Sequence, residues 1–483
     1  MLPPRELWPE ISMGELRYPD VMNCAAELLD TMVGQGNGDR IALRFPGGTW
    51  TYRELLEHSN RIAHVLTRDL GLVPGNRVLL RGPNNPMMAA CWFAVLKAGG
   101  VVVCTMPLLR ARELAYLIDK AQIGLALCDA RVLQELEQAA AGSTLKRIVQ
   151  FGTDAPGSLD TLTRSRPAIF TNIATAADDV ALIAFTSGTT GQAKGTMHFH
   201  RDVLAICDLF PRHVLRPTRD DIFCGSPPLA FTFGLGGLLL FPLRVGASTV
   251  LLEQATPPQL LQGIQDFRAT VCFTAPTAYR AMAASSTGFD LSSLRKCVSA
   301  GEHLPAATFE KWRAVTKLKI IDGIGSTEML HIFISASGDD IRAGSTGRAV
   351  PGYRARVIDG NGNEVPPGTI GHLAVQGPTG CRYLDDTERQ RAYVKNGWNL
   401  PGDSYRMDED GYFWYQARTD DLIVSSGYKI SGPEVENALL DHPSVAECGV
   451  VGIPDEERGC IVKAFVVLGA PGPAADRASS CTR

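Results

Sequence analysis

The sequence lacks a strong excess of charge of either sign. Its 483 residues include 47 basic and 51 acidic side chains, which give a formal net charge of −4 at pH 7. Proteins that bind nucleic acid usually carry a basic surplus. The charge balance therefore argues against a nucleic-acid partner.

Long hydrophobic runs are also missing. The most apolar stretch, residues 235–243, is interrupted by glycine and is shorter than the roughly 20 residues that span a bilayer. Residues 3–6 read Pro-Pro-Arg-Glu, where a signal peptide would need an apolar core. These absences predict a cytoplasmic protein with no membrane partner.

Paired cysteine spacing is a third absence. The twelve cysteines are scattered from Cys24 to Cys481 without a Cys-x-x-Cys arrangement, and the nine histidines do not cluster with them. Zinc sites and disulfide frameworks normally show such pairing. We therefore expect buried, reduced thiols.

What is present is the composition of an ordinary globular protein, with 45% apolar and 20% charged residues. Strand-like and helix-like patterns alternate through most of the chain. The clearest of them predict strands at 77–81, from 101, at 249–252 and at 270–274, and helices within 52–70, at 86–97 and at 258–267. Such alternation indicates an α/β fold built from layered subdomains.

The composition changes after about residue 340. Glycine and proline become dense and separate short alternating runs, and Asp359-Gly360-Asn361-Gly362 is a strong turn signal. We expect small β hairpins that form a barrel-like region. Beyond residue 420, a helix at 432–440 and strands at 445–451 and 463–468 predict a small, incomplete α+β lobe. The predicted division is a large N-terminal domain at 1–419, a partial C-terminal lobe at 420–468 and a disordered tail at 469–483.

The most informative motif is a loop suited to phosphate. Residues 186–195 read Thr-Ser-Gly-Thr-Thr-Gly-Gln-Ala-Lys-Gly and follow the apolar run 180–185, which predicts a buried strand. Glycines let backbone N–H groups approach an anion, hydroxyl groups donate further hydrogen bonds, and Lys194 supplies positive charge. A flexible Ser/Thr/Gly turn is the alternative. The position of Lys194 does not fit a Walker A loop.

This loop resembles the signature loop of the adenylate-forming superfamily, which contains acyl-CoA synthetases, adenylation domains of peptide synthetases and firefly-type luciferases. Ala193 stands where the family usually has proline. The run 322–328, Asp-Gly-Ile-Gly-Ser-Thr-Glu, resembles the second core motif of the superfamily. Taken alone, it would be read as the cap of a helix. Its hydroxyl and carboxylate also suit Mg²⁺ and phosphate, because Mg²⁺ prefers oxygen ligands.

The resemblance implies a role for each matching residue. Those expected to bind ATP are Thr186, Ser187, Gly188, Thr189, Thr190, Gly191, Lys194, Ala300, Gly301, Glu302, Asp322, Gly323, Ile324, Thr327, Asp403 and Arg418. Lys194, Thr327 and Glu328 are the expected catalytic residues, and Glu328 and Thr327 the expected ligands of Mg²⁺.

A pocket for the acid is expected around residues 227–236, where aromatic rings are bordered by small residues that can form a flat slot. Core packing explains Phe231 and Phe233 equally well, and His331 either meets an ortho substituent or is a core histidine. Further runs at 323–335, 377–383 and 396–398 resemble the benzoate- and 2-aminobenzoate–CoA ligases. The expected acid-binding residues are Ala230, Phe231, Phe233, Gly234, Gly325 and His331.

The end of the chain also resembles the family up to about residue 468. Residues 418–421 resemble its hinge, with Asp420 as the pivot, and Gly427, Tyr428 and Lys429 belong to a loop expected on the coenzyme A side. In the family the small lobe swings about this hinge between two half-reactions. Members carry a further lysine near the acid carboxylate, but none follows Lys463 here. We expect a truncation or frameshift, and slow adenylate formation because one charge is absent.

The implied activity is that of an acid–thiol ligase. An aromatic carboxylic acid, of the benzoate or 2-aminobenzoate type, reacts with ATP in the presence of Mg²⁺ to give an acyl-adenylate, and coenzyme A then takes the acyl group. One alternative is a non-catalytic binder of nucleotide or aromatic acid. Another is an adenylation module that acts with a carrier protein. The ring substituent and the oligomeric state stay open.

Overall fold

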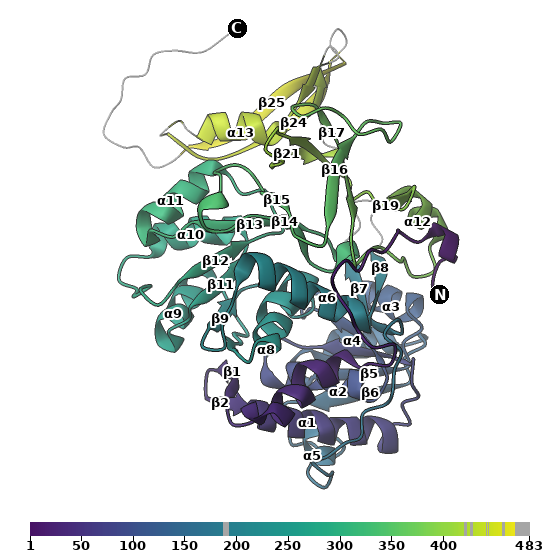
Figure 1. Cartoon of the computed structure of the whole chain (residues 1–483). Helices are drawn as coiled ribbons and strands as arrows, with labels where there is room; N and C mark the ends of the chain where they lie inside the picture. Colours follow the sequence, from purple (N-terminus) through teal and green to yellow (C-terminus); the bar gives the residue numbers. More distant parts are fainter. Residues whose placement is uncertain are drawn as a thin grey trace.

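Three large sheets carry most of the described chain (Figure 1). The computed structural model describes residues 1–186, 193–419, 423–425, 428–440, 442, 444–455 and 459–468. Layers of helices and sheets confirm the α/β class predicted from the alternating patterns.

The first sheet has six strands in the order β6-β5-β3-β4-β7-β8, all parallel to their neighbours except β8, which runs antiparallel to β7. Its strands are β3 (Arg77–Arg81), β4 (Val101–Thr105), β5 (Leu125–Asp129), β6 (Arg147–Phe151), β7 (Val180–Thr186) and β8 (Lys194–Phe199). The associated helices are α1 (Tyr52–His64), α2 (Pro86–Lys97), α3 (Ala111–Lys120), α4 (Leu133–Ala140), α5 (Leu159–Thr163) and α6 (His200–Phe210).

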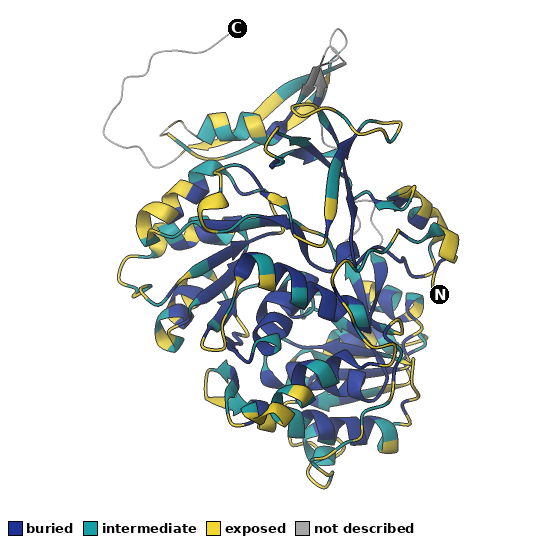
Figure 2. Cartoon of the chain, viewed as in Figure 1, coloured by how far each residue is buried: buried dark blue, intermediate teal, exposed yellow. Residues whose placement is uncertain are grey.

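Helix α2 shows why these predictions succeed. The Asn85 side chain accepts the N–H of Met88 at its start, and Pro86 occupies the first helical position, where its missing N–H is harmless. Eleven of its twelve residues are buried, so the helix lies inside the molecule (Figure 2). The bounds of β3 and α2 are those that the sequence predicted.

The second sheet has nine strands in the order β15-β14-β13-β12-β11-β9-β10-β1-β2. Its strands are β1 (Ile41–Phe45), β2 (Gly48–Thr51), β9 (Ile222–Gly225), β10 (Ser248–Val250), β11 (Val271–Thr274), β12 (Lys296–Ser299), β13 (Ile320–Gly325), β14 (Ile332–Ser335) and β15 (Arg348–Ala349). Its helices are α7 (Thr232–Leu235), α8 (Phe241–Arg244), α9 (Pro257–Phe267), α10 (Pro276–Ser285) and α11 (Ala306–Thr316).

The third sheet is antiparallel and corresponds to the barrel-like region expected after residue 340. Strand β17 pairs with three partners, β16, β19 and β20, so the sheet branches there. The strands are β16 (Arg354–Ile358), β17 (Ile370–Gln376), β18 (Val394–Lys395), β19 (Trp398–Asn399), β20 (Asp403–Met407) and β21 (Phe413–Arg418), with helix α12 (Thr387–Tyr393) between β17 and β18. The predicted turn at 359–362 is present: the Gly362 N–H donates to the Asp359 carbonyl over 3.1 Å.

A small α+β unit follows in the chain and lies against α11 (Figure 1). It consists of β22 (Ile423–Ser425), β23 (Tyr428–Ile430), α13 (Gly432–Leu440), β24 (Val445–Asp455) and β25 (Gly459–Leu468). The bounds of α13 match the prediction, whereas β24 and β25 are longer than predicted because they pair along almost their whole length. An ion pair between Arg280 and Glu447 (2.8 Å) joins this unit to α10.

The described cysteines carry free thiols, as the scattered spacing predicted, and most of them are buried. In the described parts of the chain, no helix combines the length and the apolar character needed to cross a membrane.

Candidate active site

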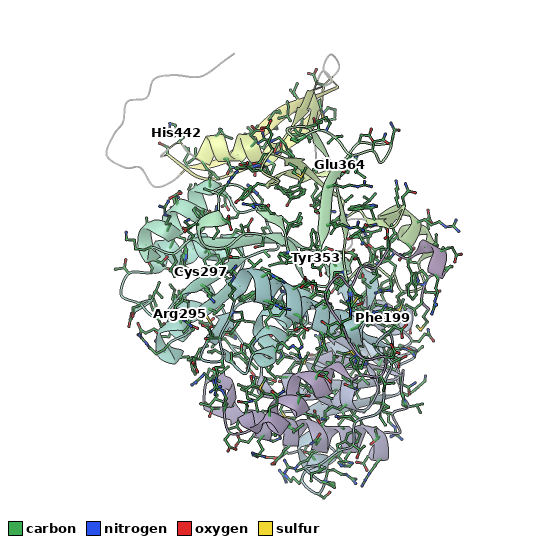
Figure 3. All side chains as sticks on the ribbon, viewed as in Figure 1. Phe199, Arg295, Cys297, Tyr353, Glu364 and His442 are labelled. Carbon is green, nitrogen blue, oxygen red and sulfur yellow. The ribbon has the colours of Figure 1, made fainter. Side chains whose placement is uncertain are left out.

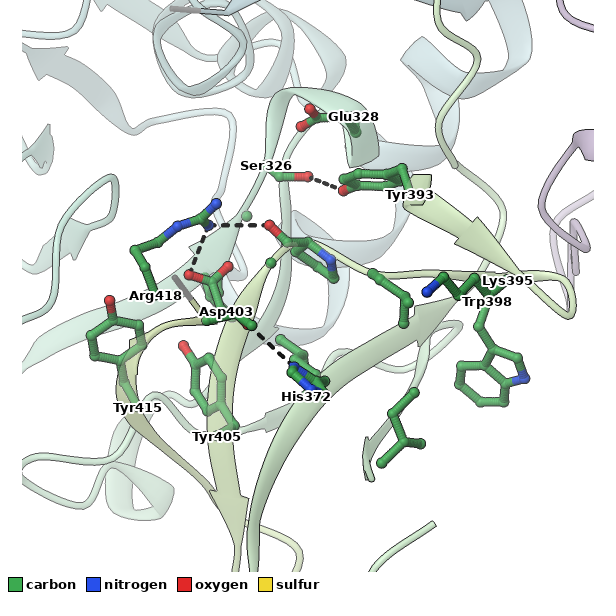
Figure 4. Close-up of a pocket in the computed structure, with 18 of the residues that line it drawn as sticks. Ser326, Glu328, His372, Tyr393, Lys395, Trp398, Asp403, Tyr405, Tyr415 and Arg418 are labelled. Carbon is green, nitrogen blue, oxygen red and sulfur yellow. Dashed lines mark hydrogen bonds and ion pairs between the residues drawn. The ribbon is translucent and has the colours of Figure 1, made fainter. Parts of the chain in front are cut away.

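A cavity of about 830 Å³ is lined by residues of all three large sheets. Strand β7 ends at it, β13 ends at it, and β20 begins at it. Figure 4 shows part of its wall. The expected site residues that line it are Thr186, Lys194, Gly301, Glu302, Asp322, Gly323, Ile324, Gly325, Thr327, Glu328, Asp403 and Arg418.

Thr186 and Lys194 form one edge of this cavity. They are the last residue of β7 and the first of β8, and they face each other across this strand pair. Both ends of the predicted phosphate loop therefore lie at the cavity. The loop residues Ser187, Gly188, Thr189, Thr190 and Gly191 lie outside the described residues, so their contact with phosphate stays a prediction.

The second motif forms a tight turn after β13. Ser326 caps the short helical turn Thr327–Met329 by accepting the N–H of Met329 over 3.2 Å. The Glu328 side chain lies in the cavity wall, and its Oε1 accepts a hydrogen bond of 2.7 Å from the Tyr383 hydroxyl. The Glu328 carboxylate and the Tyr383 hydroxyl thus lie side by side at the cavity.

These groups fit the expected Mg²⁺. No set of three or more His, Cys, Asp or Glu side chains in the described chain can hold a metal ion by itself. Mg²⁺ needs no such set where substrate phosphates supply ligands together with one or two carboxylates. Glu328 offers that carboxylate, and its bond to Tyr383 fixes its orientation.

Two glycines of β13 let the strand lie close to β14. A Cβ on Gly323 would come within 2.8 Å of the Ile332 side chain, and a Cβ on Gly325 within 2.7 Å of the His331 carbonyl group. Packing of β13 on β14 therefore favours glycine at both positions.

Asp322 carries a carboxyl group in an unusual environment. It lines the cavity from β13, and its Oδ1 is buried without a hydrogen-bond partner among the described residues. Burial raises the pKa of Asp322 to about 8. The group therefore holds a proton at neutral pH, and it can donate a hydrogen bond as well as accept one.

The segment 300–302 contributes backbone to the same wall. Gly301 has φ +90° and open space where a Cβ would stand, so a ligand can approach its backbone. Glu302 lines the cavity, but its Oε2 accepts from the Thr277 hydroxyl over 2.6 Å. Ala300 is 4% exposed and packs in the core; it is not among the lining residues.

Asp403 and Arg418 form an ion pair in the wall of the cavity (Figure 4). They face each other across the β20–β21 pair, with 3.0 Å between Oδ1 and Nη1. Burial raises the pKa of Asp403, and the charge of Arg418 opposes that rise. Gly402 precedes the pair with φ +82°, and a Cβ there would lie 2.9 Å from Nη2 of Arg418.

The expected acid-binding residues lie mostly outside this cavity. Among them only Gly325 lines it. Phe231 is 40% exposed, whereas the Phe233 ring packs 5.7 Å from the His331 ring. His331 is fully enclosed in this aromatic cluster, and burial lowers its pKa to about 3, so the ring is neutral. Ala230 lies in the turn before α7 and Gly234 within α7, where a Cβ on Gly234 would strike the Pro228 carbonyl oxygen at 2.1 Å.

The hinge and the coenzyme A loop are described only in part. Asp420 and Gly427 lie outside the described residues. Tyr428 and Lys429 belong to β23, which pairs with β22, and their side chains are not described. The predicted roles of these four residues stay predictions.

Sequence reasoning missed several aromatic and basic residues that line the cavity. They are His303, Arg356, His372, Tyr383, Arg389, Tyr393, Lys395, Tyr405 and Tyr415. Only Tyr383 carried a signal, because it ends the run 377–383 that already resembled the CoA ligases. The others stand on strands, on α12 or, for His303, in the loop between β12 and α11, and distant packing brings them to the site.

Comparison with known proteins agrees with this geometry. The family model of the AMP-binding enzymes matches residues 31–382, and that of the AMP-binding enzyme C-terminal domain matches 434–480. Benzoate–CoA ligase of Thauera aromatica is 34% identical over 460 residues, which cover 94% of this chain and 87% of the relative. The 4-hydroxybenzoate–CoA/benzoate–CoA ligase of Rhodopseudomonas palustris is 32% identical and matches over 93% and 85% of the two chains.

Solved structures resemble the fold over most of its length. An anthranilate CoA ligase in complex with anthranoyl-AMP superposes with a TM-score of 0.90 and 33% identity, covering 95% of this chain and 89% of that one. A benzoate CoA ligase from Burkholderia xenovorans LB400 has a TM-score of 0.85 and 31% identity, covering 93% and 91%. The motifs, the cavity and these matches together show that the chain belongs to the AMP-binding enzymes, the adenylate-forming superfamily that its signature loop predicted.

Proposed function

We propose that this chain activates an aromatic carboxylic acid of the benzoate or 2-aminobenzoate type as an acyl-adenylate and then transfers the acyl group to coenzyme A. As an AMP-binding enzyme with acyl–CoA ligases among its relatives, it is an acid–thiol ligase. One observation carries the proposal: Lys194 on β8, Glu328 in the turn after β13 and Asp403 on β20 line a single cavity.

The arrangement suits ATP across the cavity. The base fits between the backbone at Gly301 and the run 322–324, and the ribose hydroxyls fit the Asp403 carboxylate. The phosphates then lie between the Thr186–Lys194 edge and the turn that carries Glu328. In this arrangement the Asp403 carboxylate can accept hydrogen bonds from the ribose hydroxyls, and the Lys194 ammonium pairs with the phosphate anions.

The first step is an in-line attack of the acid carboxylate on the α-phosphorus of ATP, which expels pyrophosphate. Negative charge builds up on the departing phosphates, and we assign its stabilisation to the ammonium of Lys194 and the hydroxyl of Thr327. No side chain acts as a nucleophile in this proposal. Positioning and electrostatic stabilisation supply the rate enhancement.

Mg²⁺ would be held by Glu328 and Thr327 together with the phosphates, and it would supply charge that neutralises the departing pyrophosphate. The protein's own contribution is the fixed Glu328 carboxylate, which accepts from Tyr383. In the second step the sulfur of coenzyme A attacks the acyl-adenylate carbonyl, and AMP leaves. Gly427, Tyr428 and Lys429 are the proposed residues on the coenzyme A side, and Asp420 the proposed pivot.

An aromatic substrate is supported by the names of the relatives, which act on benzoate, 4-hydroxybenzoate or anthranilate. It is also supported by the ring cluster around His331, in which the Phe241 ring lies 4.5 Å away. Gly325 lines the cavity beside this cluster. We therefore keep Ala230, Phe231, Phe233, Gly234, Gly325 and His331 as the proposed acid-binding residues.

The test measures AMP release and ATP–pyrophosphate exchange with benzoate and 2-aminobenzoate, each with and without coenzyme A. Exchange without coenzyme A, followed by thioester and AMP when it is added, supports the proposal. ATP binding without exchange for any aromatic acid would favour the non-catalytic binder instead. Exchange without thioester would favour delivery to a carrier protein. The exchange rate also tests the expected slow turnover.

A further inference from the structure

Three buried side chains hold three consecutive residues of the catalytic turn. His198 Nε2 lies 2.8 Å from the Thr327 carbonyl oxygen, the Tyr383 hydroxyl donates to Glu328 Oε1 over 2.7 Å, and the Thr379 hydroxyl donates to the Met329 carbonyl over 2.8 Å. All three donors are at most 2% exposed. None of the three belongs to the residues expected to bind substrate.

The hydrogen bond of His198 fixes the tautomer of its ring. A carbonyl oxygen only accepts, so Nε2 must carry the proton that it donates to Thr327. In the neutral imidazole Nδ1 is then bare, and it lies 4.0 Å from Oδ2 of Asp202. His198 therefore acts on the turn as a directed donor.

A buried ion pair joins the supports of the turn. Nη1 of Arg382 lies 2.9 Å from Oδ2 of Asp202, and neither side chain is exposed. The guanidinium also lies 4.0 Å from the centre of the Phe199 ring, which stands inside the molecule (Figure 3). A buried ion pair adds little net stability compared with apolar residues, because desolvation offsets the attraction. Fixing one segment against another explains its presence better.

The segment that carries Tyr383 is also bonded to the strand that begins at Lys194. Met197 N–H donates to the Arg382 carbonyl over 2.9 Å, and Leu384 N–H donates to the Gly195 carbonyl over 2.8 Å. The positions of Lys194 and Glu328 are thereby coupled through these backbone hydrogen bonds and the side chain of Tyr383.

The turn needs such support because its exit is strained. Leu330, which follows Met329, has φ +71°, a region that costs a leucine about 1–2 kcal/mol. Strained backbone persists only where surrounding contacts determine it. The three donors supply contacts immediately before this residue.

We propose that His198, Thr379 and Tyr383 are positioning residues, which hold the 327–329 turn so that Thr327 and Glu328 meet the ATP phosphates and Mg²⁺. The Arg382–Asp202 ion pair holds the segment that carries Tyr383 against the segment that carries His198. This inference rests on the proposed function, since it assumes those roles for Thr327 and Glu328.

The experiment compares Tyr383→Phe with the matched control Tyr52→Phe. Tyr52 is also a buried tyrosine, and its hydroxyl donates a hydrogen bond of 2.6 Å to the Ala247 carbonyl. Neither Tyr52 nor Ala247 lines the cavity. Binding of Mn²⁺ to the protein–ATP complex is followed by electron paramagnetic resonance, which needs no turnover, and ATP–pyrophosphate exchange gives kcat and KM. Removing a group that orients a metal ligand typically lowers metal affinity or activity about 10- to 100-fold.

We expect Tyr383→Phe to weaken Mn²⁺ binding and to lower kcat by about tenfold or more, with the KM for the aromatic acid unchanged. Tyr52→Phe should change neither quantity. His198→Gln keeps an N–H near the Thr327 carbonyl and should retain most of the activity that His198→Leu loses. Should His198→Leu not fold, Tyr383→Phe carries the test alone.

Mn²⁺ affinity and kcat of Tyr383→Phe within twofold of those of Tyr52→Phe would overturn the inference. Equal losses in His198→Gln and His198→Leu would also contradict it. Glu328→Gln separates this failure from that of the proposed function. If Glu328→Gln leaves exchange intact, the proposed role of the turn is wrong. If it abolishes exchange while Tyr383→Phe does not, only the positioning role fails.

Discussion

At the scale of single residues, burial acts in the same direction on two carboxyl groups that line the cavity. Burial raises the pKa of both Asp322 and Asp403, because a carboxylate loses hydration when water is excluded. They differ in their neighbours: Arg418 opposes the rise at Asp403, whereas Oδ1 of Asp322 has no partner among the described residues. Asp403 is thus the better anion, and Asp322 the better hydrogen-bond donor.

The raised pKa of Asp322 predicts a pH-dependent stability. Between about pH 4 and pH 8 the folded state retains a proton that the unfolded state has lost, so the free energy of unfolding falls as the pH rises through this window. Asp322→Asn removes this term. In thermal melts, the unfolding midpoint of the variant minus that of the wild type should therefore increase between pH 5 and pH 8.

A matched control for this measurement is Asp290→Asn. Hydrogen bonds from Ser292 lower the pKa of Asp290, so this carboxylate is already ionised at pH 5. Its contribution to the free energy of unfolding should therefore not vary between pH 5 and pH 8. A constant difference between Asp322→Asn and the wild type across the same range would contradict the protonated state of Asp322.

A second residue-scale prediction concerns Gly402. Alanine at this position would adopt φ +82° and bring its Cβ within 2.9 Å of Nη2 of Arg418. Gly411, with φ +79° and open space around the missing Cβ, is the control. Both changes should cost about 1–2 kcal/mol of stability. Only Gly402→Ala should also weaken ATP binding in calorimetry, because it displaces Arg418 from Asp403. Equal ATP affinities in the two variants would refute this role.

At the scale of elements, the strand pair β13–β14 positions the catalytic turn. The pair is antiparallel, and its register shifts between Ile324 and Gly325. Residues 326–331 form the turn that joins the two strands. Close packing of backbone on backbone at Gly325 therefore controls the direction in which Thr327 and Glu328 leave the sheet.

This geometry predicts different effects of alanine at the two glycines of β13. At Gly325 a Cβ meets backbone atoms of β14 at 2.7 Å, whereas at Gly323 it meets the Ile332 side chain at 2.8 Å. A side chain can rotate away more easily than a strand can move. Overpacking typically costs about 1–3 kcal/mol, and Gly325→Ala should lie at the upper end and Gly323→Ala at the lower. Thermal melts that rank them in the opposite order would contradict the packing argument.

At the scale of the whole molecule, residues of all three large sheets line the cavity. A ligand bound there therefore contacts segments that lie far apart in the sequence. ATP should therefore stabilise the fold by linkage, by about 2.7 kcal/mol at a concentration one hundred times its dissociation constant. A thermal melt with ATP and Mg²⁺ should show a raised midpoint, and Asp403→Ala should show a smaller rise. No shift with ATP, at concentrations where calorimetry detects binding, would argue that ATP binds elsewhere.

Much of the fold could be read from local patterns. The apolar spacing and the Asn85–Pro86 start gave the bounds of α2, and the stretches 77–81 and 432–440 gave those of β3 and α13. Strand β25 was predicted too short, because its first residues owe their strand conformation to pairing with β24. Pairing between segments leaves no pattern within either segment.

The sequence by itself determined which chemistry is available: a lysine after a glycine-rich loop, a carboxylate beside a hydroxyl, and an aspartate behind a glycine. Each is a local motif, because a turn or a strand end needs particular residues at fixed spacing. Only the tertiary structure decided that β7, β13 and β20 bring these motifs to one cavity, and that His198, Thr379 and Tyr383 support the turn between them. The physical reason is that such contacts join residues between about 50 and 180 positions apart, and long-range packing of a core, not local preference, selects them.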